Sequence, residues 1–200
     1  MKNNKHQLHE KNPNKKLRSV FLFAFITIGM LVFPAGAYVL TIYPNHGRSI
    51  RAWWNGAVYQ GEDGVIRQQT KYDCGVVCLQ MILRDRGISA RLGELRLSAQ
   101  TSYAGTSLLG LKRAADKYGV KASAWSLSQK DLQKIELPVI AFVDGNHFVV
   151  ISNVNKYGIL TILDPVRGRL QYSESSFARH WNGEALIFGE DSNRVLSSAD

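Results

Sequence analysis

The hydrophobic pattern changes its period near residue 138, and this change constrains the fold more than any other feature of the sequence. Before it, apolar residues at helical spacing predict helices over 73–86, 90–97, 107–117 and 128–135, with Thr106 as the N-cap of the third. After it, short β-branched and apolar runs predict strands over 138–143, 147–154, 158–163 and 185–188. Helices first and strands second indicate an α+β fold, with N-terminal helices packed on a C-terminal antiparallel sheet.

The segment before these elements has a different composition. Residues 1–18 carry six basic side chains against Glu10, which predicts a solvated, disordered tail. Residues 19–43 contain no charged side chain, and a run of this length predicts one transmembrane helix. Because the basic residues cluster before the run, the positive-inside rule places the tail in the cytoplasm. The sequence thus predicts a single-pass protein of the bacterial cytoplasmic membrane with an extracytoplasmic (periplasmic) domain.

A cleaved signal peptide is the competing interpretation of this run. Residues 34–37 read Pro-Ala-Gly-Ala, a small-residue site of the kind that signal peptidases cut. The apolar run continues to residue 43, however, which a cleaved signal does not require, so an uncleaved anchor is favoured. Residues 44–63 are then expected to be a linker, 64–190 the domain and 191–200 a disordered tail. Trp53 and Trp54 in the linker fit either the membrane interface or packing against the domain.

The basic character of the chain does not indicate a nucleic-acid partner. The N-terminal tail alone supplies +5 of the net charge of +9. No zinc-finger spacing and no basic stripe interleaved with aromatic residues accompanies this charge.

Cys74 is the candidate nucleophile. It falls in the first turn of a predicted helix, where the macrodipole and the free N–H groups favour a thiolate. Gly75 is expected to leave room beside it for an incoming substrate. Cys78 lies one helical turn later, and a disulfide at that spacing would distort the helix, so Cys78 is expected in the core and Cys74 as a free thiol. A buried cysteine that acts as a small hydrophobic residue is the alternative for Cys74.

His147 stands at the start of an apolar strand and is the candidate general base. The strand over 158–163 ends at Asp164, because Pro165 cannot continue the ladder. If Asn153 pairs with Gly158 across a four-residue loop, His147 falls opposite Asp164, whose carboxylate could orient the imidazole. An Asp-Pro turn with its own local hydrogen bonds is the alternative for Asp164.

Gln68, six residues before Cys74, is the candidate oxyanion donor together with the Cys74 backbone N–H. Gln69 is a rival for this role. A metal site built from the two cysteines, His147 and Asp164 is a further alternative, but Cys-x3-Cys on one helix is not the usual ligand spacing. No metal or cofactor is predicted.

In combination, these motifs closely resemble the bacteriocin-processing cysteine peptidases that cut double-glycine leaders, peptidase family C39. The resemblance spans about residues 66–188 and rests on Gln68-x4-Asp73-Cys74-Gly75-x2-Cys78, Gly145-Asn146-His147-Phe148-Val149-Val150, Leu163-Asp164-Pro165 and Phe177-x3-Trp181-Asn182-Gly183. It implies a papain-like fold, a catalytic triad of Cys74, His147 and Asp164, and an oxyanion role for Gln68.

Many members of that family are domains of peptide-exporting ABC transporters. This sequence carries no Walker-A motif and no multi-span membrane segment, so ATP hydrolysis and transport are not expected of it. The expected function is a cysteine endopeptidase that processes leader or pro-peptides of exported peptides, of the Gly-Gly type by resemblance. A non-catalytic peptide-binding or chaperone domain of a secretion system is the alternative. Peptide or protein substrates and the membrane are the expected partners, and whether a separate exporter is one stays open.

Overall fold

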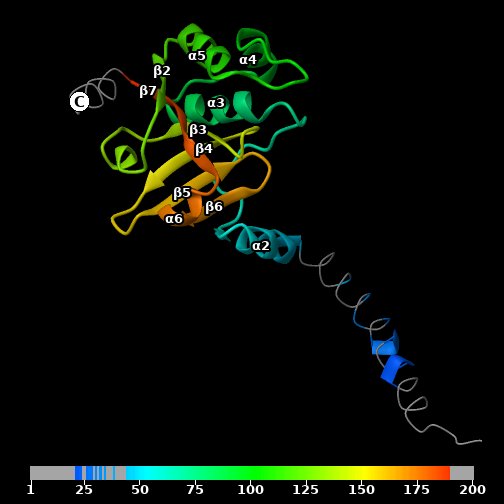
Figure 1. Cartoon of the computed structure of the whole chain (residues 1–200). Coiled ribbons are helices and arrows are strands. Elements are labelled where there is room, and N and C mark those ends of the chain that lie inside the picture. The colour runs from blue at the N-terminus through cyan, green and yellow to red at the C-terminus, as the bar shows by residue number, and fades with distance from the viewer. Residues whose placement is uncertain are drawn as a thin grey trace, which may run out of the picture. The chain divides into compact units, whose positions relative to one another are not determined.

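The computed structural model describes residues 44–189 and, before them, residues 21–23, 26–28, 30, 32, 34 and 38 (Figure 1). Residues 1–47 and 48–200 form two compact units. The described residues before position 44 are helical. The predicted tails over 1–18 and 191–200 and most of the predicted transmembrane helix over 19–43 lie outside the described residues. None of the helices among the described residues combines the length and the apolar character that a bilayer crossing requires.

One antiparallel sheet organises the second unit. Within residues 44–189 its seven strands lie in the order β1-β6-β5-β4-β3-β7-β2. Their bounds are β1 Ala57–Tyr59, β2 Ala122–Ser126, β3 Val139–Val143, β4 His147–Val154, β5 Ile159–Asp164, β6 Gly168–Ser173 and β7 Trp181–Phe188. The central strands β5, β4, β3 and β7 come from the second half of the chain, where the sequence predicts them.

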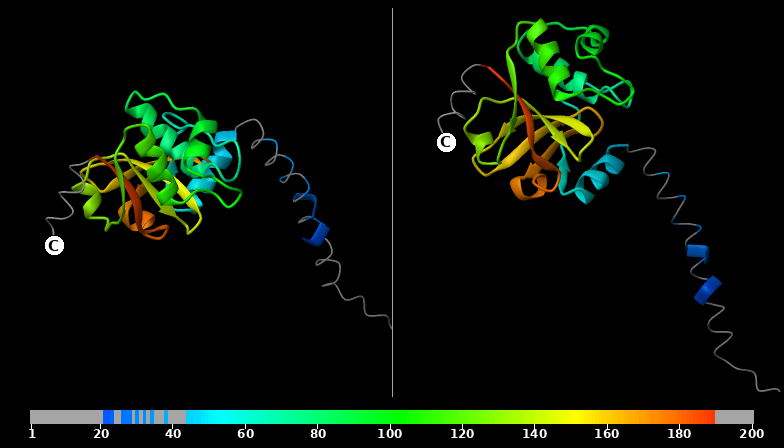
Figure 2. Two further views of the ribbon diagram at one scale, coloured as in Figure 1. Left: turned by 90° about the horizontal axis from the view of Figure 1, so that it is seen from above. Right: turned by 45° about the horizontal axis from the view of Figure 1, so that its top comes forward.

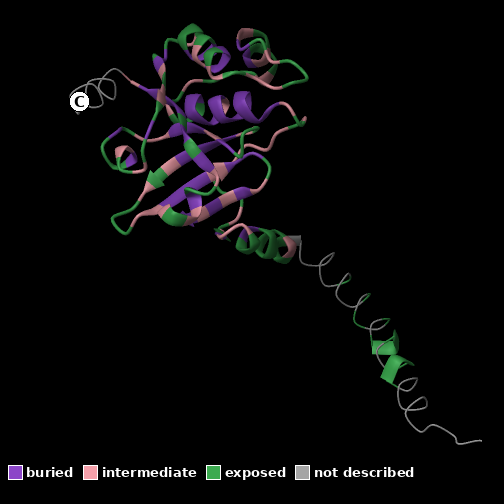
Figure 3. Ribbon diagram, viewed as in Figure 1, coloured by how far each residue is buried: buried purple, intermediate pink, exposed green. Residues whose placement is uncertain are grey.

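Three helices gather on one face of this sheet (Figures 1 and 2). Within residues 44–189 the helices are α2 Pro44–Trp54, α3 Cys74–Asp85, α4 Leu92–Ser98, α5 Leu108–Lys117, the 3-10 turn η1 Asp131–Gln133 and α6 Glu174–Phe177. α3 packs on β4 and β3 and is itself covered by α4 and α5, so it is the most buried helix (Figure 3). The helix that begins at Cys74 is therefore held between the sheet and two other helices.

The central strands are buried on both faces. Successive side chains of a strand point to opposite faces. On one face they meet α3 and α5 through Ile140, Phe148, Val150, Leu186 and Phe188. On the other face they meet a second cluster that contains Val139, Ala141, Val149, Ile151, Ile187, Leu132, Phe177 and Trp181. This double burial explains why these strands read as continuous apolar runs rather than as an alternating pattern.

Three of the four predicted helices are confirmed, with changes at their ends. α3 begins at Cys74 and ends at Asp85, within one residue of the prediction. The N-cap of α5 is Ser107, whose Oγ accepts from the Gly110 N–H at 3.0 Å, so the prediction of Thr106 is wrong. The predicted helix over 128–135 is reduced to η1, because the Asp131 carboxylate accepts hydrogen bonds from the Ser128 N–H and hydroxyl and closes a tight turn.

The predicted linker over 44–63 instead contains α2 and β1, and β1 pairs with β6 at the edge of the sheet. The sequence analysis also misses β2 and β6. β6 alternates between buried and partly buried residues, and only the first residue of β2 is buried. Both strands contain small or polar side chains, so they lack the apolar runs of the central strands.

The predicted register of the β4–β5 hairpin is wrong. Asn153 pairs with Thr161 rather than with Gly158, and Val150 pairs with Leu163, with an irregularity between Ile151 and Asn153. The turn is closed by Asn155, whose N–H donates to the Ile159 carbonyl and whose side-chain oxygen accepts from the Ile159 N–H. A turn stabilised by an Asn side chain thus moves the pairing by three residues near the turn.

Candidate active site

Cys74 is the first residue of α3 and is 7% exposed. Burial by itself raises the pKa of its thiol. Hydrogen bonds with His147 and with the backbone of Phe148 and Gly75, together with the charge of His147, outweigh burial and lower that pKa below its usual value. The position at the helix start therefore combines with a specific partner to favour the thiolate.

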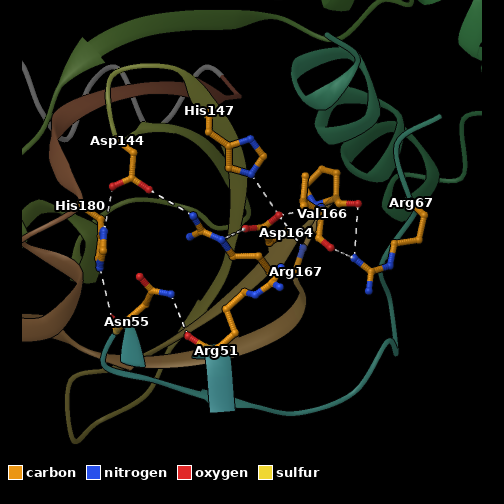
Figure 4. Close-up of polar contacts among 10 residues, drawn as sticks. Arg51, Asn55, Arg67, Asp144, His147, Asp164, Val166, Arg167 and His180 are labelled. Carbon is orange, nitrogen blue, oxygen red and sulfur yellow. Dashed lines mark hydrogen bonds and ion pairs between the residues drawn. The ribbon is translucent and has the colours of Figure 1, made fainter. Parts of the chain in front are cut away.

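His147 is the first residue of β4, and its side chain is 14% exposed. Its Nε2 lies 3.0 Å from Oδ1 of Asp164 (Figure 4). The other ring nitrogen, Nδ1, is left for the hydrogen bond with Cys74. Burial lowers the pKa of His147, but the hydrogen bonds with Asp164 and Cys74 and their charges raise it to about 9. The imidazolium and the thiolate thus stabilise each other.

His147 and Asp164 meet although the predicted register is wrong. If the pairing of Val150 with Leu163 continues, Asp164 falls opposite Val149, two residues along the strand from His147. A shift of two residues keeps side chains on the same face of a sheet, whereas a shift of one would separate them. The two side chains are diagonal neighbours, within reach of an imidazole and a carboxylate.

Asp164 also forms the local turn that the sequence analysis offers as an alternative. Its Oδ1 accepts from the backbone N–H groups of Val166 at 2.7 Å and Arg167 at 3.0 Å. The residue is 1% exposed, and although burial raises its pKa, the bonds from His147 and from these N–H groups lower it below the usual value. The Asp-Pro turn and the contact with His147 are therefore compatible, since the turn holds the carboxylate ionised and in place.

Arg167 connects Asp164 to a second carboxylate. Its Nε lies 3.8 Å from Asp164 Oδ2, and its Nη2 lies 3.5 Å from Asp144 Oδ2 (Figure 4). Asp144, in the β3–β4 turn, contacts Nδ1 of His180 at 2.8 Å, and Nε2 of His180 lies 3.2 Å from the Asn55 carbonyl. Asp164 Oδ2 is buried and has no hydrogen bond from the described residues, so the guanidinium is the cation that faces it.

A second buried acid, Asp73, directly precedes Cys74. The Asp73 carboxylate is fully buried and is held by Nε and Nη2 of Arg96 at 2.8 and 2.6 Å, and by the Thr70 N–H at 2.9 Å. Burial raises the pKa of Asp73, but these bonds lower it overall. Arg96 thereby balances a negative charge next to the Cys74 thiolate and ties α4 to the start of α3.

These supporting residues are missed by the sequence analysis. Arg96 is 23 residues from Asp73, and Arg167 is 23 residues from Asp144, so no short motif indicates either pair. Arg167 offers a weak signal, since it lies three residues after an Asp that opens a turn.

Gln68 is partly buried in the loop before α3, and Gln69 is exposed. The Gln68 side-chain N–H donates to the Thr70 carbonyl at 2.9 Å. The side-chain oxygen Oε1 is buried and has no hydrogen bond from the described residues. The backbone N–H of Gln68 donates to the Pro165 carbonyl at 3.2 Å. The structure thus joins Gln68 to the Asp-Pro segment, while its oxyanion role stays a prediction.

Gly75 has a packing role that differs from the expected one. A Cβ at this position would lie 3.1 Å from Cδ2 of Phe148 and 3.3 Å from Cδ1 of Leu111. The space beside Gly75 is therefore filled by core side chains, so the prediction that it admits substrate is wrong. The glycine lets α3 approach β4 closely, next to His147.

Cys78 is a free, buried thiol in the same core, and burial raises its pKa well above the usual value. The two thiols therefore lie in opposite electrostatic environments. Among the described residues, no group of three or more His, Cys, Asp or Glu side chains has an arrangement that could hold a metal ion.

Helices pack on an antiparallel sheet, and hydrogen bonds join a Cys, a His and an Asp side chain where the two layers meet. This is the arrangement of a cysteine peptidase domain. The family model of the Peptidase C39 family matches residues 63–193. The chain belongs to this family.

Three similar proteins illustrate the relationship. The lactococcin-G-processing and transport ATP-binding protein LagD of Lactococcus lactis is 34% identical over 129 residues, which are 62% of this chain but only 18% of LagD. The "Probable functional amyloid protease FapD" of Pseudomonas fluorescens is 27% identical over 152 residues, 68% of this chain and 65% of FapD. The third is a double glycine motif protease from an AMS/PCAT transporter, whose crystal structure contains the leader peptide. Its sequence is 30% identical, and the two structures match with a TM-score of 0.59 over 66% of this chain and 96% of that one.

Proposed function

We propose that this protein is a cysteine endopeptidase in which Cys74, His147 and Asp164 form the catalytic triad. The observation that carries the proposal is the continuous set of hydrogen bonds from the Cys74 thiol through His147 to Asp164. It joins the start of a helix to two strands, and it pairs a thiol of lowered pKa with an imidazole of raised pKa. Such a pair is the activated nucleophile that acyl transfer requires.

In this reaction the Cys74 thiolate attacks the carbonyl carbon of a peptide bond, and the electron pair of the C=O bond moves to the oxygen. His147 gives its Nδ1 proton to the leaving nitrogen as the C–N bond breaks, which leaves a thioester on Cys74. Water then attacks the thioester with His147 as the base, and the thiolate departs. Asp164 stabilises the imidazolium and fixes the orientation of the ring throughout.

The oxyanion is stabilised by the backbone N–H of Cys74 and by the side-chain amide of Gln68. For this role the Gln68 N–H must turn from the Thr70 carbonyl to the substrate oxygen.

The proposed substrates are the precursors of exported peptides. The leader or pro-peptide of such a precursor ends in Gly-Gly, and cleavage follows this pair. The likeness to a double glycine motif protease with a bound leader peptide supports this class. The proposed location is the bacterial cytoplasmic membrane, with the uncharged run over 19–43 as a single uncleaved anchor and the peptidase domain outside the cytoplasm. Reporter fusions at the C-terminus test this placement.

Cysteine labelling and peptide cleavage test the peptidase activity. Iodoacetamide should alkylate Cys74 far faster than Cys78, and His147→Ala should remove this selectivity. Cys74→Ser should abolish cleavage of a peptide with a Gly-Gly leader, whereas Cys78→Ala, the matched control, should retain it. Equal labelling of the two thiols would contradict the proposal, and tight binding of the peptide without cleavage would favour a non-catalytic peptide-binding domain.

A further inference from the structure

The helix α2 presents an apolar face to the outside of the folded domain. Trp53 is 73% exposed, Trp54 79% and Ile50 55%. Most of the α2 ribbon has the colour of exposed residues (Figure 3). These three residues are spaced i, i+3 and i+4, so they lie on one side of the helix. Two large aromatic residues and an isoleucine exposed together on one helix are unusual for a protein surface that faces only water.

The opposite side of α2 is the one that contacts the domain. Ala52, which the helical repeat places away from the three exposed residues, is buried in the second core cluster. Next to the end of α2, the Asn55 carbonyl lies 3.2 Å from Nε2 of His180. The helix therefore uses a small residue for packing and leaves its large apolar residues outside, the reverse of the usual arrangement for a helix at a protein surface.

We propose that this face of α2, defined by Ile50, Trp53 and Trp54, lies on the surface of a lipid bilayer and orients the peptidase domain against the membrane. The uncharged run over 19–43 ends one residue before α2, so the helix begins where a chain that leaves a bilayer would emerge. The inference rests on the membrane placement proposed above and is independent of the catalytic mechanism.

The side chains fit the chemistry of the lipid headgroup region. Tryptophan is enriched at the boundary between acyl chains and headgroups, because its ring is apolar and its N–H can hydrogen-bond to the interface. Arg51 follows Ile50 in the sequence and is exposed, where its guanidinium can contact lipid phosphates. A short helix with aromatic residues on one face and arginine at its flank is typical of segments that lie in the plane of a membrane.

Tryptophan quenching tests the proposal. The full chain is reconstituted into phosphatidylglycerol-containing vesicles whose acyl chains carry bromine near the headgroups, and vesicle flotation confirms that the chain is bound. Bromine quenches tryptophan only at short range, so Trp53 and Trp54 should be quenched while Trp181, which is buried in the core, should not. Trp53→Phe together with Trp54→Phe should remove most of the quenching.

A pair of charge substitutions separates docking from anchoring. Trp53→Glu with Trp54→Glu should leave the chain bound to vesicles but should accelerate amide exchange in α2. The matched control is Leu97→Glu with Leu109→Glu, which changes exposed apolar residues on α4 and α5 and should leave α2 exchange unchanged.

Two results would overturn the proposal in distinguishable ways. A chain that floats with vesicles but shows no quenching at Trp53 and Trp54 contradicts the docking of α2 alone, and concentration-dependent crosslinking through this face would then assign it to a second copy. A chain that does not float contradicts the membrane placement as well. Neither result affects the peptidase assignment, which is measured by cleavage.

Discussion

Nε2 of His147 lies 3.0 Å from Oδ1 of Asp164, although the two residues are diagonal neighbours rather than a directly opposed pair on the β4–β5 hairpin. The same oxygen accepts two backbone N–H groups of the turn that follows β5. The orientation of the histidine is therefore tied to a turn that its own local hydrogen bonds hold in place.

Replacing Asp164 with asparagine tests the charge of this contact. The amide oxygen can still accept from the turn, but the negative charge that raises the pKa of His147 is lost. We expect kcat to fall by up to about 10⁴-fold, the loss that the same change causes in a Ser-His-Asp triad, and Asp164→Ala to cost at least as much. Peptide cleavage and the Cys74 alkylation rate at neutral pH measure the effect. Asp116→Asn, which changes an exposed acid on α5, should leave both unchanged.

Arg167→Gln should lower kcat by about 3- to 10-fold with little change in KM, because the guanidinium is the cation that faces the buried Oδ2 of Asp164 and its loss disfavours the ionised carboxylate. Loss of this cation should also move the acid limb of the pH–rate profile to higher pH, a shift that a purely structural defect would not produce. Arg169→Gln removes a similar arginine that pairs with the exposed Asp63 and serves as the control. An equal effect of both substitutions would contradict the role of Arg167.

Gln68→Ala should reduce kcat by about 10- to 100-fold if the amide stabilises the oxyanion, since one such donor contributes strongly to the transition state. Gln69→Ala should change kcat less than twofold, because Gln69 is exposed. Single-turnover cleavage by the two variants distinguishes them. Unimpaired cleavage by Gln68→Ala would contradict the oxyanion role of Gln68. The backbone N–H of Cys74 would then be the remaining proposed donor to the oxyanion.

The alkylation rate of Cys74 should rise as the pH passes the lowered pKa of the thiol and should stay high above about pH 9, because the thiolate remains when His147 loses its proton. Peptide cleavage should decline above the same pH, because the leaving nitrogen then lacks its proton donor. In Cys74→Ala the pKa of His147 should fall, since the thiolate helps to raise it, and an NMR titration of the histidine measures this.

The same pKa shifts set the pH dependence of stability. The pKa of His147 is raised from 6.5 to about 9, so its stabilising contribution is complete below pH 6.5 and is lost as the pH rises through about 9. The pKa of Asp164 is lowered from 3.8, so its contribution is present above that value and is lost as the pH falls through the lowered pKa. Thermal unfolding of the full chain should therefore show its maximum between these limits, and a maximum outside them would contradict the assignment.

Gly110→Ala should lower the free energy of unfolding by about 2–3 kcal/mol. A Cβ at this position of α5 would lie 2.3 Å from the Ala99 carbonyl oxygen, so α4 and α5 would have to separate. Gly93→Ala is the matched control, because no atom lies within 4 Å of the added Cβ and alanine favours a helix. Circular dichroism on heating should show a large loss of stability for the first variant and none for the second.

Much of the site could be predicted because its residues lie at the ends of elements that the local sequence defines. The apolar period places Cys74 at the start of α3, and the apolar run after His147 places that residue at the start of β4. The register of β4 with β5 could not be predicted, because the Asn155 side chain closes the turn and the irregularity near Ile151 moves the pairing. The prediction still places His147 and Asp164 close together, because the register error near the site is two residues and keeps both side chains on one face of the sheet.

The sequence by itself determined the order of α3, α4, α5 and the central strands, and it singled out Cys74, His147 and Asp164 as one candidate site, because local periodicity and short motifs encode them. Only the tertiary structure decided which residues support that site and which surface is left uncovered. Arg96 and Asp144 act on residues about 20 positions away, and the outward face of α2 is defined by the burial of Ala52 on its other side. Such relationships depend on how distant segments pack, and packing is a property of the whole domain rather than of any local pattern.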